Sequence, residues 1–420
     1  MKKFIALSMV LVVLAGTGFA QLTVKGEANV ALAPLVFVDN DAKDDQVGPA
    51  FGRNDGDKSE MKLDVAGAAE KVGFRVTFSA KVSKSAISTF EISDWAGVWI
   101  KPLEALKIDG GRFNIDTLRG KVGDGGLTNY TVKSGAQDDI FNRFKGENAL
   151  ALSLTPIQGL FIGAQLNNVA DWGKETGGSP IYSLRNTVWI GGVPEAYHNV
   201  QIAAGYEIDG VGLARVQYVG GQPSAGKPDT SGPLTTAGGY QRIEAAFAYT
   251  GMSGLTLDVG GKIPLGFTEY YDAGTTKKIG NYQPAYQVSL GIQYGLDALT
   301  IPVRVDTKFG GITDNTETDD KDTVSEAFIL NAHLWPSYKV LDNTSVGLDF
   351  GIEFIGETKK DGTKIEGKDG GLRIGFGAWL EQLYGPGSIK VGLAYRVAGE
   401  VDSTKEPGVF TIPVIFKAAF

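Results

Sequence analysis

The chain has 420 residues, a formal net charge of −8 and no cysteine. This acidic balance argues against nucleic-acid binding, and without cysteine neither a disulfide nor a lipoprotein anchor is expected. Glycine is abundant, with 58 residues, and aromatic residues make up 10% of the chain. Because an interior glycine costs a helix about 1 kcal/mol relative to alanine, this composition favours many strands joined by tight turns.

The first twenty residues have the composition of an export signal. Lys2 and Lys3 precede an apolar run from Phe4 to Leu14, and Gly18-Phe19-Ala20 has the small-x-small form of a cleavage site. The apolar run is shorter than the roughly 18 residues of a membrane-spanning helix, so residues 1–20 are predicted to be a secretory signal peptide. Residues 21–420 are expected to form a single domain, since no linker or change of composition divides them.

From residue 22 onward, apolar residues recur at every second position, as they do on one face of a strand. Tight turns are predicted near residues 70, 102, 156, 209–210, 251, 297, 336 and 386, and long polar loops near 39–59, 82–94, 114–146, 168–197, 221–239, 265–282, 310–324, 356–370 and 398–409. Short turns at one end and long loops at the other are typical of outer-membrane barrels. With segment 182–190 placed in the fourth loop, these connections join eighteen strands; sixteen is the alternative.

The apolar register of the later segments carries no charge, as in Val346, Leu348 and Phe350, whereas the other register carries residues such as Asp349 and Glu353. Alternation alone fits a soluble β-sandwich equally well, because there the apolar register would face a core. The last ten residues, TIPVIFKAAF, are apolar at every second position and include Phe416 and the terminal Phe420. They resemble the closing strand of outer-membrane barrels. Together, these features predict an all-β, transmembrane, antiparallel up-and-down barrel.

Two segments resemble the general bacterial outer-membrane porin family. Residues 95–113 (WAGVWIKPLEALKIDGGRF) resemble a porin strand pair that ends in Gly-Arg. Residues 141–166 resemble the R-x-x-N-S strand and Gly-rich hairpin that follow, with Arg143 and Asn148 at wider spacing and alanine in place of the serine. The resemblance implies that the loop after the fifth strand, residues 114–146, folds into the barrel and narrows its pore.

Charged residues of that loop and of the wall are the candidate site. Opposed charges would create a transverse field that sorts charged solutes. The alternative is a solvated surface loop whose charges have no specific role. The candidates are Asp116, Arg119, Lys121, Asp124, Asp138 and Asp139 in the loop, and Arg75, Arg304, Arg373 and Arg396 on the wall.

The expected function is therefore that of a porin in the bacterial outer membrane, which passes small hydrophilic solutes and ions by passive diffusion. Its expected partners are outer-membrane lipid and these solutes, without nucleic acid, cofactor or metal; the resemblance also raises a homotrimer, to which no residue pattern points. No enzyme is expected, because His198 and His333 lie near no nucleophile motif. The alternatives are a barrel that acts as an adhesin or surface structure through its long loops, and a secreted soluble all-β protein.

Aromatic residues suggest one further role. Trp95, Trp99 and Trp379 fall on the inward register, so stacking of sugars along the pore is a minor hypothesis.

Overall fold

The computed structural model describes residues 21–39, 46–51, 59–83, 86–117, 122, 125–127, 131, 143–167, 200–220, 241–265, 268–271, 278–315 and 322–419. The predicted signal peptide, segment 182–190, His198 and Phe420 lie outside these residues. Among the described residues, no helix is both long enough and apolar enough to span a membrane.

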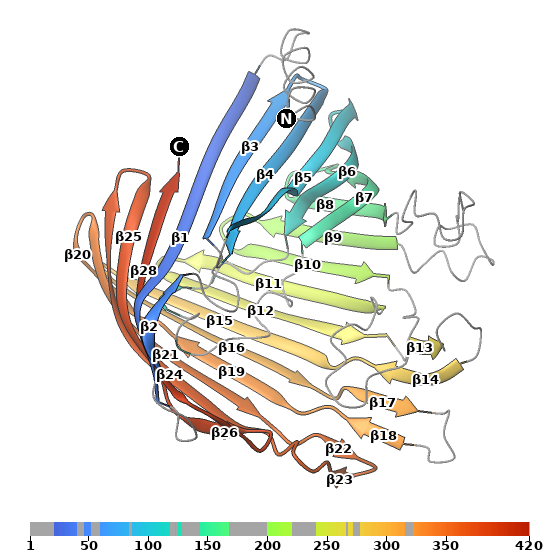
Figure 1. Cartoon of the computed structure of the whole chain (residues 1–420). Coiled ribbons are helices and arrows are strands. Elements are labelled where there is room, and N and C mark those ends of the chain that lie inside the picture. Colours follow the sequence, from blue (N-terminus) through green and yellow to red (C-terminus); the bar gives the residue numbers. More distant parts are fainter. Residues whose placement is uncertain are drawn as a thin grey trace.

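Eighteen antiparallel strands follow one another around a closed barrel (Figure 1). Strands β19 and β20 count as one, because both pair with β16 and with β21. The strands are β1 (Gln21–Asp39), β3 (Ser59–Ala68), β4 (Val72–Ser83), β5 (Ala86–Leu103), β6 (Leu106–Thr117), β7 (Arg143–Leu154), β8 (Leu160–Asn167), β9 (Val200–Ile208), β10 (Gly212–Val219), β11 (Arg242–Met252), β12 (Leu255–Pro264), β15 (Tyr286–Leu296), β16 (Leu299–Phe309), β19 (Ile329–Leu334) with β20 (Ser337–Leu341), β21 (Thr344–Ile355), β24 (Gly371–Tyr384), β25 (Gly387–Arg396) and β28 (Gly408–Ala419).

The first and last strands close the ring. β28 pairs with β1 along most of its length, with Phe416 opposite Val30. β1 begins beside the short β3–β4 turn, since Gln21 pairs with Ala68. The prediction of an up-and-down barrel with eighteen rather than sixteen strands is confirmed.

Shorter strands extend the wall at the end opposite the short turns (Figure 1). They lie in segments for which long loops were predicted. β2 (Gln46–Phe51) pairs with β1, and β26 (Gly399–Val401) and β27 (Thr404–Glu406) form a hairpin beside β24. A second sheet contains β13 (Thr268–Tyr271), β14 (Lys278–Gln283), β17 (Ile312–Asn315), β18 (Asp322–Ser325), β22 (Lys359–Lys360) and β23 (Thr363–Lys364).

Two predicted connections are wrong. The predicted loop 82–94 belongs largely to strands, because β5 starts at Ala86 and Thr89 pairs with Lys81; the β4–β5 ladder is bulged between Lys81 and Val82. Pro336 marks no turn but the break between β19 and β20. Proline lacks the N–H that a ladder needs, so the pairing lapses there and resumes, and the turn comes at 342–343.

Candidate functional site

The two faces of the barrel wall differ sharply in polarity. On β21, Leu348, Phe350 and Phe354 point outward, with 61%, 42% and 44% of their surfaces exposed, whereas Asp349 and Glu353 point inward and are buried. The outward registers of β16, β21 and β24 carry no charged residue. Apolar side chains that remain exposed on a closed barrel suit the hydrocarbon of a membrane.

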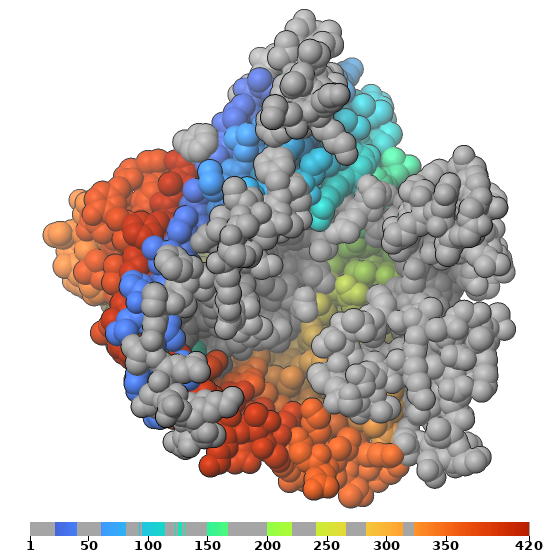
Figure 2. All heavy atoms as spheres, in the orientation of Figure 1, coloured from blue at the N-terminus to red at the C-terminus, as the bar shows by residue number. Residues whose placement is uncertain are grey.

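The described residues of the connection after β6 lie inside the barrel, against the far wall. Figure 2 shows the hollow between the N-terminal strands in blue and cyan and the C-terminal strands in orange and red. Of this connection the structure describes Val122, Gly125–Leu127 and Thr131, and the side chains of Val122, Leu127 and Thr131 are almost completely buried. We call these residues the lumen loop. They contact side chains of β12, β21, β24 and β25, which lie across the ring from β6.

Two wall carboxylates accept hydrogen bonds from the lumen loop. The Leu127 amide N–H donates to Asp349 Oδ2 at 2.6 Å, and the Thr131 hydroxyl donates to Asp349 Oδ1 at 2.7 Å. The Val122 amide N–H donates to Asp258 Oδ2 at 2.5 Å. Hydrogen bonds to a buried carboxylate are stronger than neutral ones, so these acids fix the loop at two points of the wall.

Glycines of the wall make room for the loop. A Cβ added at Gly375 would lie 2.4 Å from the Thr131 backbone carbon, and one at Gly392 would lie 2.6 Å from Leu127 Cδ1. Leu127 packs in a buried apolar cluster with Trp379 and Ala394. The seat of the lumen loop therefore combines two carboxylates with a glycine-lined apolar surface.

The predicted loop charges stay predictions. Asp116 lies on β6, where it pairs with Phe144. Arg119, Lys121, Asp124, Asp138 and Asp139 lie outside the described residues.

The predicted wall cations lie on the inner wall, and three of them form ion pairs with wall or rim carboxylates. Arg75 contacts Asp64 at 2.8 Å, and Arg304 contacts Asp306 at 3.1 Å. Arg373 contacts Glu353 at 2.5 Å and Glu406 at 2.6 Å. Arg396 pairs with Gly375 in the β24–β25 ladder, and its positive charge helps to lower the pKa of the Glu406 carboxyl. Whether these four cations oppose the loop charges stays a prediction.

The Arg373–Glu406 pair gives a pH-dependent contact at the rim. The Arg373 guanidinium, with a smaller contribution from Arg396, holds the pKa of the Glu406 carboxyl below its ordinary value. Because the folded pKa is depressed, the stabilisation is present above the ordinary glutamate pKa of about 4.3 and is lost as the pH falls through the lower folded value.

We expect amide exchange in the β26–β27 hairpin, corrected for intrinsic rates, to accelerate below about pH 4. Glu406→Gln should remove most of this pH dependence. A variant whose amide exchange depends on pH as the parent's does would contradict the role of the Glu406 carboxylate.

A row of hydrogen-bonded polar side chains crosses the inner wall from β8 to β11. Gln165 donates to Gln201 at 2.6 Å, Gln201 to Gln217 at 2.9 Å, and Gln217 to Glu244 Oε2 at 2.5 Å. Arg242 donates to the other oxygen of Glu244 at 2.5 Å. All four side chains from Gln165 to Glu244 are buried, so each depends on its neighbours for hydrogen bonds.

Gln217 occupies the middle of this row. Gln217→Leu should lower the free energy of unfolding by about 1–3 kcal/mol, because it removes two buried hydrogen bonds and leaves a donor of Gln201 unsatisfied. Urea unfolding of the barrel in vesicles measures this loss. Val216→Leu, on the outward face of the same strand, is the control and should change the stability little.

The three inward tryptophans carry cations over their rings. Arg75 lies 4.8 Å from the ring centre of Trp95, and Lys390 lies 4.4 Å from that of Trp379. Lys101 and Lys107 each lie 5.6 Å from the ring centre of Trp99. The inward placement of these residues agrees with the sequence, but cations already occupy ring faces on which a sugar would stack. Cation–π contacts are the better account of these indoles.

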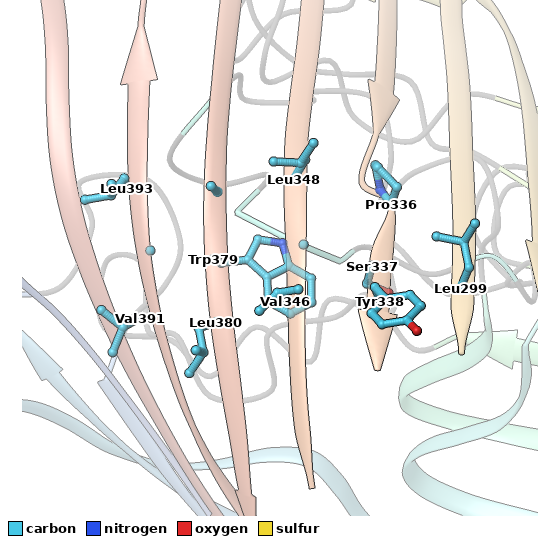
Figure 3. A pocket seen from close by; sticks show the side chains of 13 residues that line it. Leu299, Pro336, Ser337, Tyr338, Val346, Leu348, Trp379, Leu380, Val391 and Leu393 are labelled. Carbon is cyan, nitrogen blue, oxygen red and sulfur yellow. The ribbon is translucent and has the colours of Figure 1, made fainter. Parts of the chain in front are cut away.

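An apolar groove of about 720 Å³ crosses the outer wall behind the seat (Figure 3). Outward residues of β16, β20, β21, β24 and β25 line it, and the indole of Trp379 lies between β24 and β21. A Cβ added at Gly347 would lie 2.3 Å from that indole. Trp379 thus packs against bare backbone on one side and contacts Leu127 of the lumen loop on the other.

Sequence reasoning missed the acids that hold the loop. The sequence does not single out Asp258, it shows Asp349 only as one inward charge, and it shows His333 only as a histidine that lies near no nucleophile motif. His333 Nε2 in fact lies 3.0 Å from Asp349 Oδ1. The signal available in the sequence was the cluster of inward glycines on β21, β24 and β25 that flanks Asp349.

No protein-family model matches the chain, and no curated protein matches it in sequence. Solved structures of similar fold include the outer membrane channel DcaP of Acinetobacter baumannii, with TM-score 0.49 and 8% identity over 95% of this chain and 97% of that chain. They also include an anion-selective porin from Comamonas acidovorans, with TM-score 0.48 and 12% identity over 95% and 100%. The outer membrane protein opdK of Pseudomonas aeruginosa has TM-score 0.45 and 13% identity over 95% and 99%.

The arrangement of the strands and the polarity of the two wall faces identify the fold class of the chain. The strands leave no open sheet edge in the ring, the outer face is apolar and exposed, and the inner face is polar. Only a helix or a closed barrel satisfies its backbone hydrogen bonds within hydrocarbon. The chain is therefore a closed transmembrane β-barrel of the outer-membrane type.

Proposed function

We propose that the chain is a porin of the bacterial outer membrane, through which small hydrophilic solutes and ions pass by diffusion. The observation that carries the proposal is the lumen loop, held inside an eighteen-stranded barrel by Asp258 and Asp349. Barrels of 16 to 18 strands enclose an aqueous channel unless something fills it. A loop fixed across that channel narrows it without needing energy input or a chemical step.

The polar inner wall supports passage of hydrated solutes. Its charges are arranged mainly as neighbouring ion pairs, such as Arg304–Asp306 and Arg373–Glu353. Such pairs present alternating charge to a solute and limit the cost of losing hydration water. The porin-like segments 95–113 and 141–166 cover parts of β5 and β6 and all of β7, the strands around the root of the loop, which agrees with the same function.

The test is electrical recording from the purified, refolded protein in a planar bilayer. Discrete and stable current steps are expected, and the reversal potential in a salt gradient reports the preference for anions or cations. Protein that migrates as a folded, heat-modifiable barrel but gives no steps over many insertions would overturn the porin function. The surface-structure alternative would then gain support.

A further inference from the structure

The Asp349 carboxylate joins the lumen loop to one side chain of the wall. Two of its hydrogen-bond donors, the Leu127 amide and the Thr131 hydroxyl, belong to the loop. The third is His333 of β19, whose Nε2 lies 3.0 Å from Asp349 Oδ1. An ionised carboxylate only accepts hydrogen bonds, so the contact is a hydrogen bond in the histidine tautomer that has its hydrogen on Nε2. His333 thus holds the same oxygen that Thr131 contacts.

The imidazole is itself fixed in place. It stacks on Trp335 with 4.6 Å between ring centres and 22° between planes. On the ladder it faces Gly351 of β21 and Arg304 of β16, and Arg304 pairs with Asp306. The side chain of His333 is 3% exposed and that of Asp349 is fully buried. The orientation of the carboxylate is therefore set by a ring that cannot turn freely.

Trp335 also lies against the lumen loop. A Cβ added at Gly125 would lie 2.2 Å from Trp335 Nε1, and one at Gly126 would lie 2.2 Å from Asp349 Oδ2. Trp335 and Asp349 thus lie directly against the loop backbone at Gly125 and Gly126. The close approach leaves the loop little freedom to shift while these contacts are intact.

We propose that His333 is a positioning residue of the pore: by orienting Asp349, it fixes the lumen loop and with it the width of the channel. This inference rests on the proposed function. Without the imidazole donor, Asp349 Oδ1 loses its bond to the wall, and the carboxylate turns with the loop instead of restraining it. The loop then samples several positions, and the channel fluctuates in width.

The test compares His333→Leu, which removes the donor, with His333→Gln, whose amide keeps an N–H donor. Single-channel recordings should show one steady open level for the parent chain and His333→Gln. His333→Leu should show noisier and larger currents and admit larger polyethylene glycols. Heat-modifiable gel migration establishes that each variant is folded. A folded His333→Leu variant with the parent's current level and noise would overturn the proposal, as would a His333→Gln variant that behaves like His333→Leu.

A second readout does not depend on conduction. Leu127→Cys introduces the only thiol of the chain and leaves the backbone N–H that bonds Asp349. Its labelling by a water-soluble maleimide should be slow, and roughly tenfold faster when His333→Leu is added, the factor that corresponds to one lost buried hydrogen bond. Equal labelling rates would overturn the proposal. If the parent barrel never conducts but the rates differ, the porin function fails while the role of His333 in seating the loop stands.

Discussion

Leu348→Arg is expected to lower the free energy of unfolding in a bilayer by about 2–4 kcal/mol, the cost of a cation on the lipid face near the midplane. Leu348 lies in the middle of β21, points away from the lumen and is 61% exposed. Its ladder partner on β24 is Ala378, so no acidic side chain stands opposite the introduced charge. Urea titration of the barrel in phospholipid vesicles, followed by tryptophan fluorescence, measures the loss.

Leu341→Arg is the matched control. Leu341 is 62% exposed, but it ends β20 beside the turn at 342–343, where the wall meets the headgroups and water. A cation there should cost only about 0–1 kcal/mol. Exposed positions of a soluble protein change stability by less than about 0.5 kcal/mol, so two equally small losses would contradict a membrane-facing outer wall. They would favour the soluble all-β alternative.

The architecture could be predicted because it depends on local pattern. Alternation along each strand fixed which residues share a face, as Leu348 and Asp349 show, and the spacing of turns fixed the strand number. Two predictions are wrong where local composition is ambiguous. Pro336 indicates a turn, although proline also interrupts strands, and the polar residues of 82–94 indicate a loop, although they belong largely to strands. Neither a strand break nor a bulged pairing leaves a signal in alternation alone.

The loop seat could not be predicted, because it joins residues that are remote in sequence. Leu127 and Asp349 are 222 positions apart, and Val122 and Asp258 are 136 apart. Which wall receives the loop depends on the closure of the ring and on where glycines leave room. The resemblance to porins suggested that residues 114–146 fold inward, but it did not indicate the acids that hold them or the contact of His333 with Asp349.

Gly375→Val is expected to displace the lumen loop and raise the single-channel conductance by on the order of twofold, because the narrowest cross-section governs flow through an aqueous pore. Valine at this position would place its Cβ 2.4 Å from the Thr131 backbone carbon, and backbone cannot yield as a flexible side chain does. Gly295→Val is the control: it adds the same side chain on β15, where the nearest atom to a new Cβ is the Gly254 oxygen at 3.7 Å. The control should conduct like the parent.

A disulfide that holds the loop in its seat complements Gly375→Val, which displaces the loop. Leu127→Cys with Gly392→Cys joins the loop to β25, since a Cβ at Gly392 lies 2.6 Å from Leu127 Cδ1 and no other cysteine competes. If the loop already occupies this seat, the oxidised barrel conducts as the parent does, because the bond joins two positions that are already in contact. Oxidation should also suppress the extra current noise of His333→Leu, and a reductant should restore it. A large fall in conductance on oxidation would instead mean that the working loop sits away from β25, and both the seat and its control by His333 would then be wrong.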